Sequence, residues 1–290
     1  MISPEARAQV LVEALPYFQQ FREITLVIKF GGSAMEDPKL VDLTLQDIAL
    51  LNVVGMHPVI VHGGGKSITR RMEITGIKAQ FVNGYRVTDA ASIRLVEETL
   101  DQEINPKLIE RLEGFKVRAR GISGKEIFLA QKAPLLKLAE GKQADLGFVG
   151  EINQVEIKPL QACIQQSIIP VLSPLACNET GQVLNVNADL AAMEAAIALQ
   201  ATKLIYLSDV PGILRDPKDE SSLISSVSEK DVEPLKQADI LSGGMLPKIE
   251  SALNALKRGV GKVQFIDGRK PHALLLELFT QAGFGTQVVL

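Results

Sequence analysis

Lysine and paired glycines lie close together at two places in the sequence, and a third glycine run follows another apolar stretch. Lys29 lies in the run VIKFGG (residues 27–32), Lys248 ends the run SGGMLPK (residues 242–248), and the third run, HGGG, occupies residues 62–65. Glycine lets backbone N–H groups approach an anion closely, and a lysine ammonium group adds a mobile positive charge. Because each run ends an apolar strand or begins a helix, together they predict phosphoryl transfer.

Two common nucleotide-binding motifs do not fit the third glycine run. A P-loop that ended in residues 65–67 would need glycine where Ile60 stands. A dinucleotide-binding fingerprint that began at Gly63 would need glycine where Ile68 stands. The sequence therefore excludes a Walker A site and removes most of the support for dehydrogenase chemistry.

Histidine and cysteine do not form a site by their spacing. His57, His62 and His272 lie far apart in the sequence, without the close pairs that typical zinc sites use. We expect His62 to be packed at the end of a strand. Cys163 and Cys177 form no CxxC motif and are predicted to be reduced thiols of a cytosolic protein.

A group of polar residues, NVNAD, occupies residues 185–189. Asn185 and Asn187 would share one face of an extended segment, and Asp189 would open the helix that follows. Asp189 could act as the N-cap of that helix. A carboxylate there could also position two lysine ammonium groups, and the two roles are compatible.

Two cations have both an ordinary and a functional interpretation. Lys29 could be a solvent-facing strand end, but loops at strand ends are where sites are built, and we favour a role in the site. Arg86, in the run NGYRVTD (residues 83–89), could be an exposed arginine or a bidentate ligand for a substrate carboxylate. The residues alone leave both interpretations of Arg86 open.

The composition limits the class of protein. The chain has 290 residues, 46% of them hydrophobic, which is enough for a sizeable core. A formal net charge of −3 argues against a nucleic-acid partner held by bulk electrostatics. No apolar stretch approaches the roughly 20 residues that a membrane span needs, and the N-terminus does not resemble a signal peptide. We therefore predict a cytoplasmic protein without a membrane partner.

Short β-branched runs alternate with longer segments of helical period, which predicts a mainly parallel central sheet with helices on both faces, a three-layer α/β sandwich. We expect residues 115–158 to differ and to form antiparallel hairpins, which could lie over a substrate as a lid. The expected buried strands are residues 26–30, 59–62, 168–172, 204–207 and 263–266, and the expected helices are residues 39–54, 66–73, 89–113, 189–200, 229–238, 245–258 and 271–280.

The N-terminal segment is predicted to be a separate helix. Ser3 would be its N-cap and Pro4 its first residue, and apolar residues follow at helical spacing. Pro16 lies inside the pattern, so we expect a kink there. The helix could fold onto its own domain, or it could be an arm that packs against another subunit.

These motifs resemble those of the amino acid kinase family, and the match extends along nearly the whole chain. The resemblance is closest to the members that phosphorylate N-acetyl-L-glutamate, which share NGYRVT (residues 83–88) and NVNAD (residues 185–189) with this sequence. It implies two lobes on one sheet: an oligomerisation helix over residues 1–22, a substrate and dimerisation lobe over residues 23–185, and an ATP-binding lobe over residues 186–290. It implies the use of ATP, with Mg²⁺ held by the nucleotide phosphates, to phosphorylate a side-chain carboxylate in arginine biosynthesis.

The resemblance also implies roles for individual residues. Lys29 and Lys248 would stabilise the transition state, and Asp189 would organise them. Gly64 and Gly65 would present backbone donors to the substrate, while Arg86 and Asn185 would hold its carboxylates. The residues implied to contact the nucleotide are Gly31, Gly32, Ser208, Asp209, Gly212, Ile213, Leu214, Gly243, Gly244 and Met245.

Finally, the resemblance implies an assembly and a regulator. Arginine-inhibited members are similar in having a kinked N-terminal helix that interlaces trimers of dimers into a homo-hexamer. Arginine would then be an inhibitor, with Tyr17, Lys203, Glu277 and Gly283 as candidate contacts. Some members also bind the PII signalling protein, but no residue of this sequence decides that. The alternatives are another family member, such as an aspartokinase or a glutamate 5-kinase, and a catalytically silent nucleotide-binding subunit.

Overall fold

The computed structural model describes residues 3–137, 143–241, 245–280 and 283–290. Its centre is an eight-stranded sheet with the strand order β16-β18-β17-β13-β1-β2-β10-β5. All neighbouring strands run parallel except β17 and β18. The strands are β1 (Thr25–Phe30), β2 (His57–His62), β5 (Ala119–Ser123), β10 (Ile169–Ser173), β13 (Lys203–Ser208), β16 (Ser226–Ser228), β17 (Lys262–Asp267) and β18 (Thr286–Val289).

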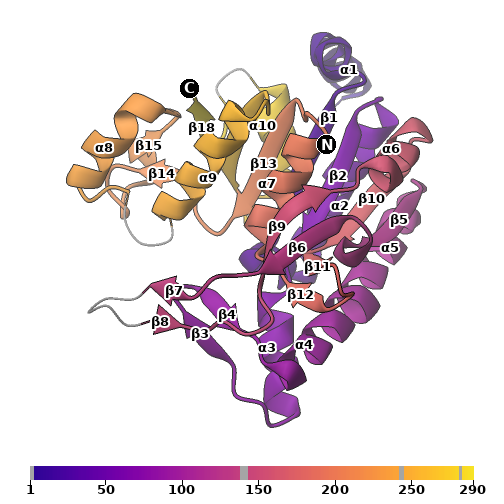
Figure 1. The fold of residues 1–290 in the computed structure, drawn as a ribbon. Coiled ribbons are helices and arrows are strands. Elements are labelled where there is room, and N and C mark those ends of the chain that lie inside the picture. Colours follow the sequence, from indigo (N-terminus) through magenta and orange to yellow (C-terminus); the bar gives the residue numbers. More distant parts are fainter. Residues whose placement is uncertain (1–2, 138–142, 242–244, 281–282) are drawn as a thin grey trace.

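Helices cover both faces of this sheet, which confirms the three-layer α/β fold (Figure 1). Successive side chains along a strand point to opposite faces of the sheet. In β1, Val27 packs on one face, and Leu26 and Ile28 pack on the other. One face carries α2 (Pro38–Val53), α3 (Gly65–Ile74), α4 (Ala90–Glu97), α5 (Asn105–Gly114) and α10 (Ala273–Phe279), and the other carries α6 (Lys158–Gln165), α7 (Ala188–Ala198), α8 (Glu229–Gln237) and α9 (Met245–Lys257).

The helical stretch predicted for residues 89–113 is interrupted by a π-helical segment. Glu98–Ile104 has π geometry and joins α4 to α5 without a loop. Pro106 follows at the start of α5. Because its ring has no N–H and clashes with the carbonyl four residues earlier, a wider turn before it is favoured. The segment places Leu100 beside Gly64, at the end of β2.

The prediction for residues 115–158 was wrong in part. Ala119–Ser123 is β5, a parallel edge strand of the main sheet, and not a hairpin strand. The second strand of the antiparallel pair is β9 (Gly150–Val155). An antiparallel pair is present as predicted, because β9 pairs with β6 (Phe128–Lys132). The short sheet is completed by β11 (Leu175–Cys177) and β12 (Val183–Asn185).

Two further hairpins lie outside the two sheets described above (Figure 1). They are β3 (Gln80–Val82) with β4 (Tyr85–Val87), and β7 (Leu136–Lys137) with β8 (Gln143–Ala144). The segments that follow them are joined, because Thr88 N donates to Leu146 O over 2.9 Å and Phe148 N donates to Thr88 O over 2.6 Å. The role of a lid, which was predicted for residues 115–158, stays a prediction.

The N-terminal helix α1 (Pro4–Phe21) begins as predicted, with Ala6 N donating to Ser3 Oγ over 3.2 Å. Its C-terminal end packs on its own domain, where the rings of Tyr17, Phe18 and Phe21 surround Phe279 of α10. Its N-terminal half instead leaves four apolar side chains exposed, Val10, Leu11, Val12 and Leu15. The helix continues through Pro16. The kink itself stays a prediction.

Candidate active site

Two of the three predicted elements, the run with Lys29 and the glycine run after His62, meet at the carboxyl edge of the main sheet. β1 ends at Phe30 and leads into Gly31, while β2 ends at His62 and leads into Gly63. On the other side of β1, β13 ends at Ser208 and leads into Asp209. β1 thus has β2 on one side and β13 on the other, and ligands of open α/β sheets bind outside the carboxyl ends of such central strands.

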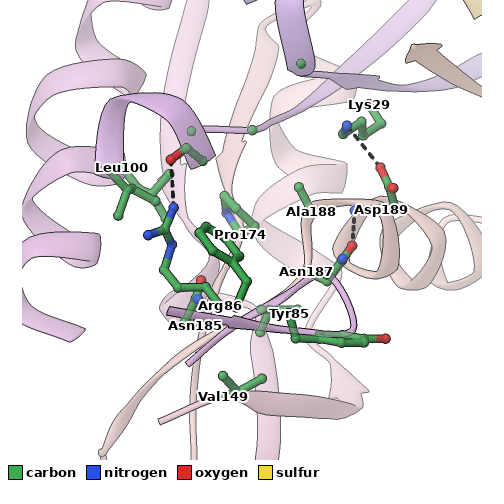
Figure 2. Close-up of a pocket in the computed structure, with 18 residues that line it drawn as sticks. Lys29, Tyr85, Arg86, Leu100, Val149, Pro174, Asn185, Asn187, Ala188 and Asp189 are labelled. Atoms are coloured by element: carbon green, nitrogen blue, oxygen red, sulfur yellow. Dashed lines mark hydrogen bonds and ion pairs between the residues drawn. The ribbon is translucent and has the colours of Figure 1, made fainter. Parts of the chain in front are cut away.

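A pocket of about 230 Å³ opens at this edge (Figure 2). Residues from distant parts of the sequence, before residue 101 and after residue 148, line this pocket. Those that sequence reasoning had singled out are Lys29, Gly32, Gly64, Gly65, Arg86, Asn185, Asn187 and Asp189. The structure therefore brings together residues that are more than 150 positions apart, as Lys29 and Asp189 are.

Lys29 and Asp189 form an ion pair in this pocket. Lys29 Nζ lies 3.1 Å from Asp189 Oδ1, and the two side chains are 14% and 22% exposed. Gly31 is needed for this approach, because a Cβ there would lie 2.9 Å from Lys29 Nζ. The absence of a side chain at Gly31 thus keeps the space beside the ammonium group open.

The capping role predicted for Asp189 was wrong. The N-cap of α7 is Asn187, whose Oδ1 accepts hydrogen bonds from Asp189 N over 2.8 Å and Leu190 N over 3.3 Å. Asp189 lies in the first turn, where the helix dipole favours a carboxylate. Because Asn187 takes over the capping, the carboxylate of Asp189 is available to Lys29.

Arg86 is buried, and the interpretation as an exposed arginine was wrong. It is 7% exposed, and its Nη2 donates to Gly65 O and Thr69 Oγ1, each over 2.8 Å. The ring of Phe81 lies over the guanidinium group, with 4.6 Å between Arg86 Cζ and the ring centroid. Burial lowers the pKa of Arg86. Within the described ranges, no carboxylate lies within 4 Å of it, so it is suited to bind an anion.

Asn185 lines the same pocket as Arg86 and ends β12. Its Nδ2 donates to Thr88 Oγ1 over 3.2 Å, and this ties β12 to the segment after β4. Asn185 also forms a bridge with Val149, a further lining residue. Two side chains predicted to hold carboxylates are therefore fixed on the same side of the pocket (Figure 2).

Asp209, which follows β13, is hydrogen-bonded to the turn that follows β1. It accepts hydrogen bonds from Ser33 N and Ser33 Oγ, each over 2.7 Å, and so holds the turn that follows Gly32. Partial burial acts to raise the pKa of Asp209, but the Ser33 hydrogen bonds and the nearby charges of Lys66 and Lys29 outweigh it, and the pKa is lowered. Asp209 is thus an ionised carboxylate between the strand ends of β1 and β13.

The structure describes some of the other residues that were predicted to contact the nucleotide. Ser208 Oγ donates to Val210 O over 2.8 Å, and Ile213 N donates to Thr286 Oγ1 over 2.8 Å. Gly212 has a φ of 145°, a conformation that favours glycine. Leu214 pairs with Leu223 in the short strands β14 (Ile213–Leu214) and β15 (Leu223–Ile224). Gly243 and Gly244 lie outside the described residues, and Met245 begins α9.

Lys248 is not among the residues that line the pocket. It lies in the first turn of α9, one turn before Ser251, whose Oγ lies 3.0 Å from Met193 Sδ of α7. Asp189 lies in the first turn of α7. Lys248 therefore projects from a helix that packs on α7, but no ion pair within 4 Å joins it to another of the described residues.

His62 behaves as the sequence predicted. It is fully buried, and its Nδ1 lies 2.8 Å from Gly63 O. Burial lowers its pKa to about 4, although the Gly63 hydrogen bond and the Asp101 charge oppose that change. At neutral pH the enclosed imidazole is therefore neutral, and it packs at the strand end.

Sequence reasoning missed several lining residues. Tyr85 lies inside the run NGYRVTD (residues 83–89), so its position was a usable signal. Leu100, Phe81 and Pro174 gave none. They reach the pocket because the π segment, the β3–β4 hairpin and the turn after β10 place them there.

A model of the amino acid kinase family matches residues 25–267. The chain belongs to this family. The acetylglutamate kinase of Akkermansia muciniphila is 48% identical over 98% of this chain and 95% of its own. The acetylglutamate kinase of Syntrophomonas wolfei is 43% identical over 100% of this chain and 99% of its own. With such relatives along its whole length, this family member is a kinase.

A solved structure of the family fold gives a second comparison. The N-acetylglutamate synthase of Neisseria gonorrhoeae, in complex with coenzyme A and N-acetyl-glutamate, is 28% identical, with a TM-score of 0.83. The match covers 98% of this chain and 63% of the synthase. Its complex with coenzyme A and L-arginine gives a TM-score of 0.79 over 97% of this chain and 65% of the synthase.

A separate cavity of about 360 Å³ contains all four residues predicted for an effector, Tyr17, Lys203, Glu277 and Gly283. Lys203 is 7% exposed, and its Nζ lies 4.9 Å from the centroid of the Phe21 ring. Burial lowers the pKa of Lys203, while the Glu277 carboxylate opposes that change. The Glu277 side chain accepts hydrogen bonds from Gln264 Nε2 and, over 2.6 Å, from Phe284 N.

In the described part of the chain, no three His, Cys, Asp or Glu side chains are grouped to hold a metal ion. None of the helices in the same residues has the length and apolar character needed to cross a membrane.

Proposed function

We propose that this kinase transfers the terminal phosphoryl group of ATP to the side-chain carboxylate of N-acetyl-L-glutamate. The observation that carries the proposal is a small pocket in which the Lys29–Asp189 pair and the buried Arg86 lie together. One cation has a carboxylate partner and the other has none within 4 Å in the described residues. Such a pocket suits a substrate with two carboxylates, one bound and one reacting.

The chemistry needs no general base. A side-chain carboxylate has a pKa near 4.3 and is ionised at neutral pH. One of its oxygens would form the new P–O bond while the bond to the ADP oxygen breaks and its electron pair stays with ADP. Lys29 and the N–H groups beside Gly31 and Gly32 would neutralise the charge on the phosphoryl oxygens. Asp189 would hold Lys29 in place.

Arg86 and Asn185 are proposed to orient the second carboxylate of the substrate. Arg86 and Asn185 both line the pocket. Gly64 and Gly65 would present N–H groups at the start of α3, where the helix dipole favours an anion. The relatives named acetylglutamate kinase support this choice of substrate.

The residues also fit a nucleotide. The glycine turn after β1 has room for phosphate beside Lys29, because Gly31 carries no Cβ. We place the nucleotide on the β13 side, against Ser208, Asp209, the segment 212–214 and the start of α9, with Lys248 as a second catalytic cation. Mg²⁺ held by the phosphates and water would supply further positive charge. Residues 23–185 would then form the substrate lobe and residues 186–290 the nucleotide lobe.

The test is Mg²⁺-dependent release of ADP with N-acetyl-L-glutamate, compared with L-glutamate, L-aspartate, carbamate and UMP. Turnover with the acetylated substrate alone is expected. Arg86→Gln should raise KM for that substrate roughly 10- to 100-fold, because a charge-assisted hydrogen bond contributes about 1.5–3 kcal/mol. Activity only with another acceptor would assign a different substrate, and nucleotide binding without turnover would favour a silent subunit.

We also propose feedback inhibition by arginine at the cavity around Glu277. The observation that favours it is the pairing of a buried carboxylate with a mainly polar wall that includes Tyr17 and Lys203. A carboxylate there suits a guanidinium group, and Lys203 suits the ligand's carboxylate. The complex of the gonococcal synthase with arginine supports this choice of ligand.

The exposed apolar face of α1 is the basis for a proposed hexamer, a trimer of dimers joined by these helices. Val10, Leu11, Val12 and Leu15 would be buried between subunits. Deletion of residues 1–20 should lower the sedimenting mass to that of a dimer and weaken inhibition by arginine. A truncated protein that stays hexameric would contradict this assembly.

A further inference from the structure

A second cavity, of about 520 Å³, lies next to the candidate active site. It shares Gly32, Gly64, Gly65, Phe81 and Arg86 with the first pocket, so the two spaces meet at the same glycine turns. Its walls are the short helix Gly32–Met35, the first turns of α3 and the β3–β4 hairpin. Apart from Arg86, the charged side chains that line this cavity have no role in the proposed mechanism.

Besides Arg86, which the proposed mechanism already uses, two cations line this cavity, Lys66 and Arg70. Arg70 is paired with Glu36, whose Oε2 lies 3.4 Å from Arg70 Nη2. Lys66, one turn earlier on α3, is exposed and has no carboxylate within 4 Å in the described ranges. Glu73 also lines the cavity, but it lies seven residues after Lys66, which places it about 10 Å further along the helix.

The positive charge of Lys66 acts on the Asp209 carboxylate. Burial and the Ser33 hydrogen bonds affect the pKa of Asp209 most, and the charge of Lys66 contributes to lowering it. Asp209 holds Ser33, which follows Gly32. Lys66 and Gly32 line the same cavity, so Lys66 lies on the α3 side of this turn, whereas Lys29 belongs to β1.

We infer that Lys66 is a further cation of the phosphoryl-transfer site, which binds a non-bridging oxygen of the terminal phosphate of the nucleotide. This inference rests on the proposed function. The transferring phosphoryl group spreads its charge over three equatorial oxygens, so that cations on different sides can each neutralise part of it. The Lys66 side chain has a flexible stem and a compact ammonium charge. It can therefore stay in contact with the phosphoryl group during transfer, without a bidentate contact. Lys29 and Lys66 thus flank the turn at Gly32.

The test compares Lys66→Ala and Lys66→Arg with Arg70→Ala, a control that removes a cation from the same helix and the same cavity. Calorimetry with Mg²⁺ would measure the binding of ADP and of AMP-PNP, which carries the terminal phosphate. Lys66→Ala should weaken AMP-PNP about tenfold and ADP much less. Lys66→Arg should restore most of the affinity for AMP-PNP, and Arg70→Ala should change the affinity for neither nucleotide.

Each other outcome has a distinct meaning. Equal weakening of both nucleotides, or no weakening, would overturn the role at the terminal phosphate. An increased KM for N-acetyl-L-glutamate with unchanged nucleotide affinity would also overturn it, because Lys66 would then contact the acceptor. If the unmodified protein bound neither nucleotide and released no ADP, the proposed function itself would fail together with this inference. Far-ultraviolet circular dichroism would verify that each variant is folded.

Discussion

Two lysines on neighbouring strands lie at opposite ends of those strands, and their surroundings differ. Lys29 lies beside Tyr206 near the carboxyl end of β1, and Lys203 begins β13 opposite Leu26. Around Lys29 the neighbours are glycine turns and a helix start, which offer backbone N–H groups. Around Lys203 they are side chains, including Phe21, Gln264 and Glu277.

The difference explains why one end suits catalysis and the other recognition. Backbone donors at glycine turns are held by the sheet and need no reorganisation when charge develops on a phosphoryl group. A cavity walled by long polar side chains can instead match the shape and charges of one ligand. The same lysine residue type therefore has different proposed roles, set by what the fold places beside it.

The largest expected effect separates the two lysines directly. Lys29→Ala should lower kcat roughly 100- to 1,000-fold, since the loss of one preorganised donor to a transition state costs about 2.7–4 kcal/mol. Lys203→Met, which keeps the volume of the buried stem, should change turnover far less when arginine is absent. Steady-state ADP release would measure both. Equal losses in the two variants would remove the contrast between the ends.

The next effect concerns the Lys203 end. Glu277→Gln should raise the arginine concentration for half-inhibition roughly 10- to 100-fold, because it removes one charge from a hydrogen-bonded pair. Glu233→Gln, an exposed substitution on α8, is the matched control. Inhibition curves at fixed substrate concentrations would show the shift. An unchanged curve for Glu277→Gln would exclude this cavity as the arginine site.

A smaller effect is expected at the turn beside Lys29. Gly31→Ala would place a Cβ 2.9 Å from Lys29 Nζ and 3.1 Å from its Cε, and so displace the ammonium group. A fall in kcat of about tenfold is expected, as small misplacements of reacting groups are costly. Gly114→Ala, where a Cβ meets nothing within 4 Å, should leave kcat unchanged. Full activity of Gly31→Ala would show that Lys29 tolerates the displacement.

The smallest effect concerns the helix that carries Glu277. Asp47 of α2 is 1% exposed, and its Oδ1 lies 2.6 Å from His272 Nδ1, beside the start of α10. Burial raises the pKa of Asp47 to about 6, although the His272 hydrogen bond and charge oppose the change. The folded protein then holds this proton more tightly than the unfolded chain, so the contribution of Asp47 to stability falls as pH rises from about 4 to 6.

Asp47→Asn should therefore reduce the loss of unfolding free energy between pH 4.5 and pH 7.5, by at most about 3 kcal/mol. Urea unfolding at the two pH values would measure it. A loss identical to that of the unmodified protein would mean that Asp47 titrates equally in the folded and unfolded chain. A changed arginine response at pH 7.5 alone would link this pair to the Glu277 cavity.

The sequence by itself determined the local features of this protein. Apolar runs predicted the five central strands, because a strand buried on both faces needs a continuous apolar stretch. Helix periodicity predicted α2, α3, α7, α8, α9 and α10, and Ser3 and Pro4 marked the start of α1. The glycine runs beside Lys29 and after His62 pointed to the carboxyl edge of the sheet, because strand ends are where parallel sheets bind ligands.

Only the tertiary structure decided which residues meet. The burial of Arg86 under Phe81 depends on a hairpin that folds back onto α3, and the ion pair of Lys29 with Asp189 depends on the parallel pairing of β1 with β13. Asn187 replaced Asp189 as the cap because both residue types accept the same hydrogen bond, and local propensity does not choose between them. Contacts between residues far apart in sequence follow from strand order and packing, which a local pattern does not contain.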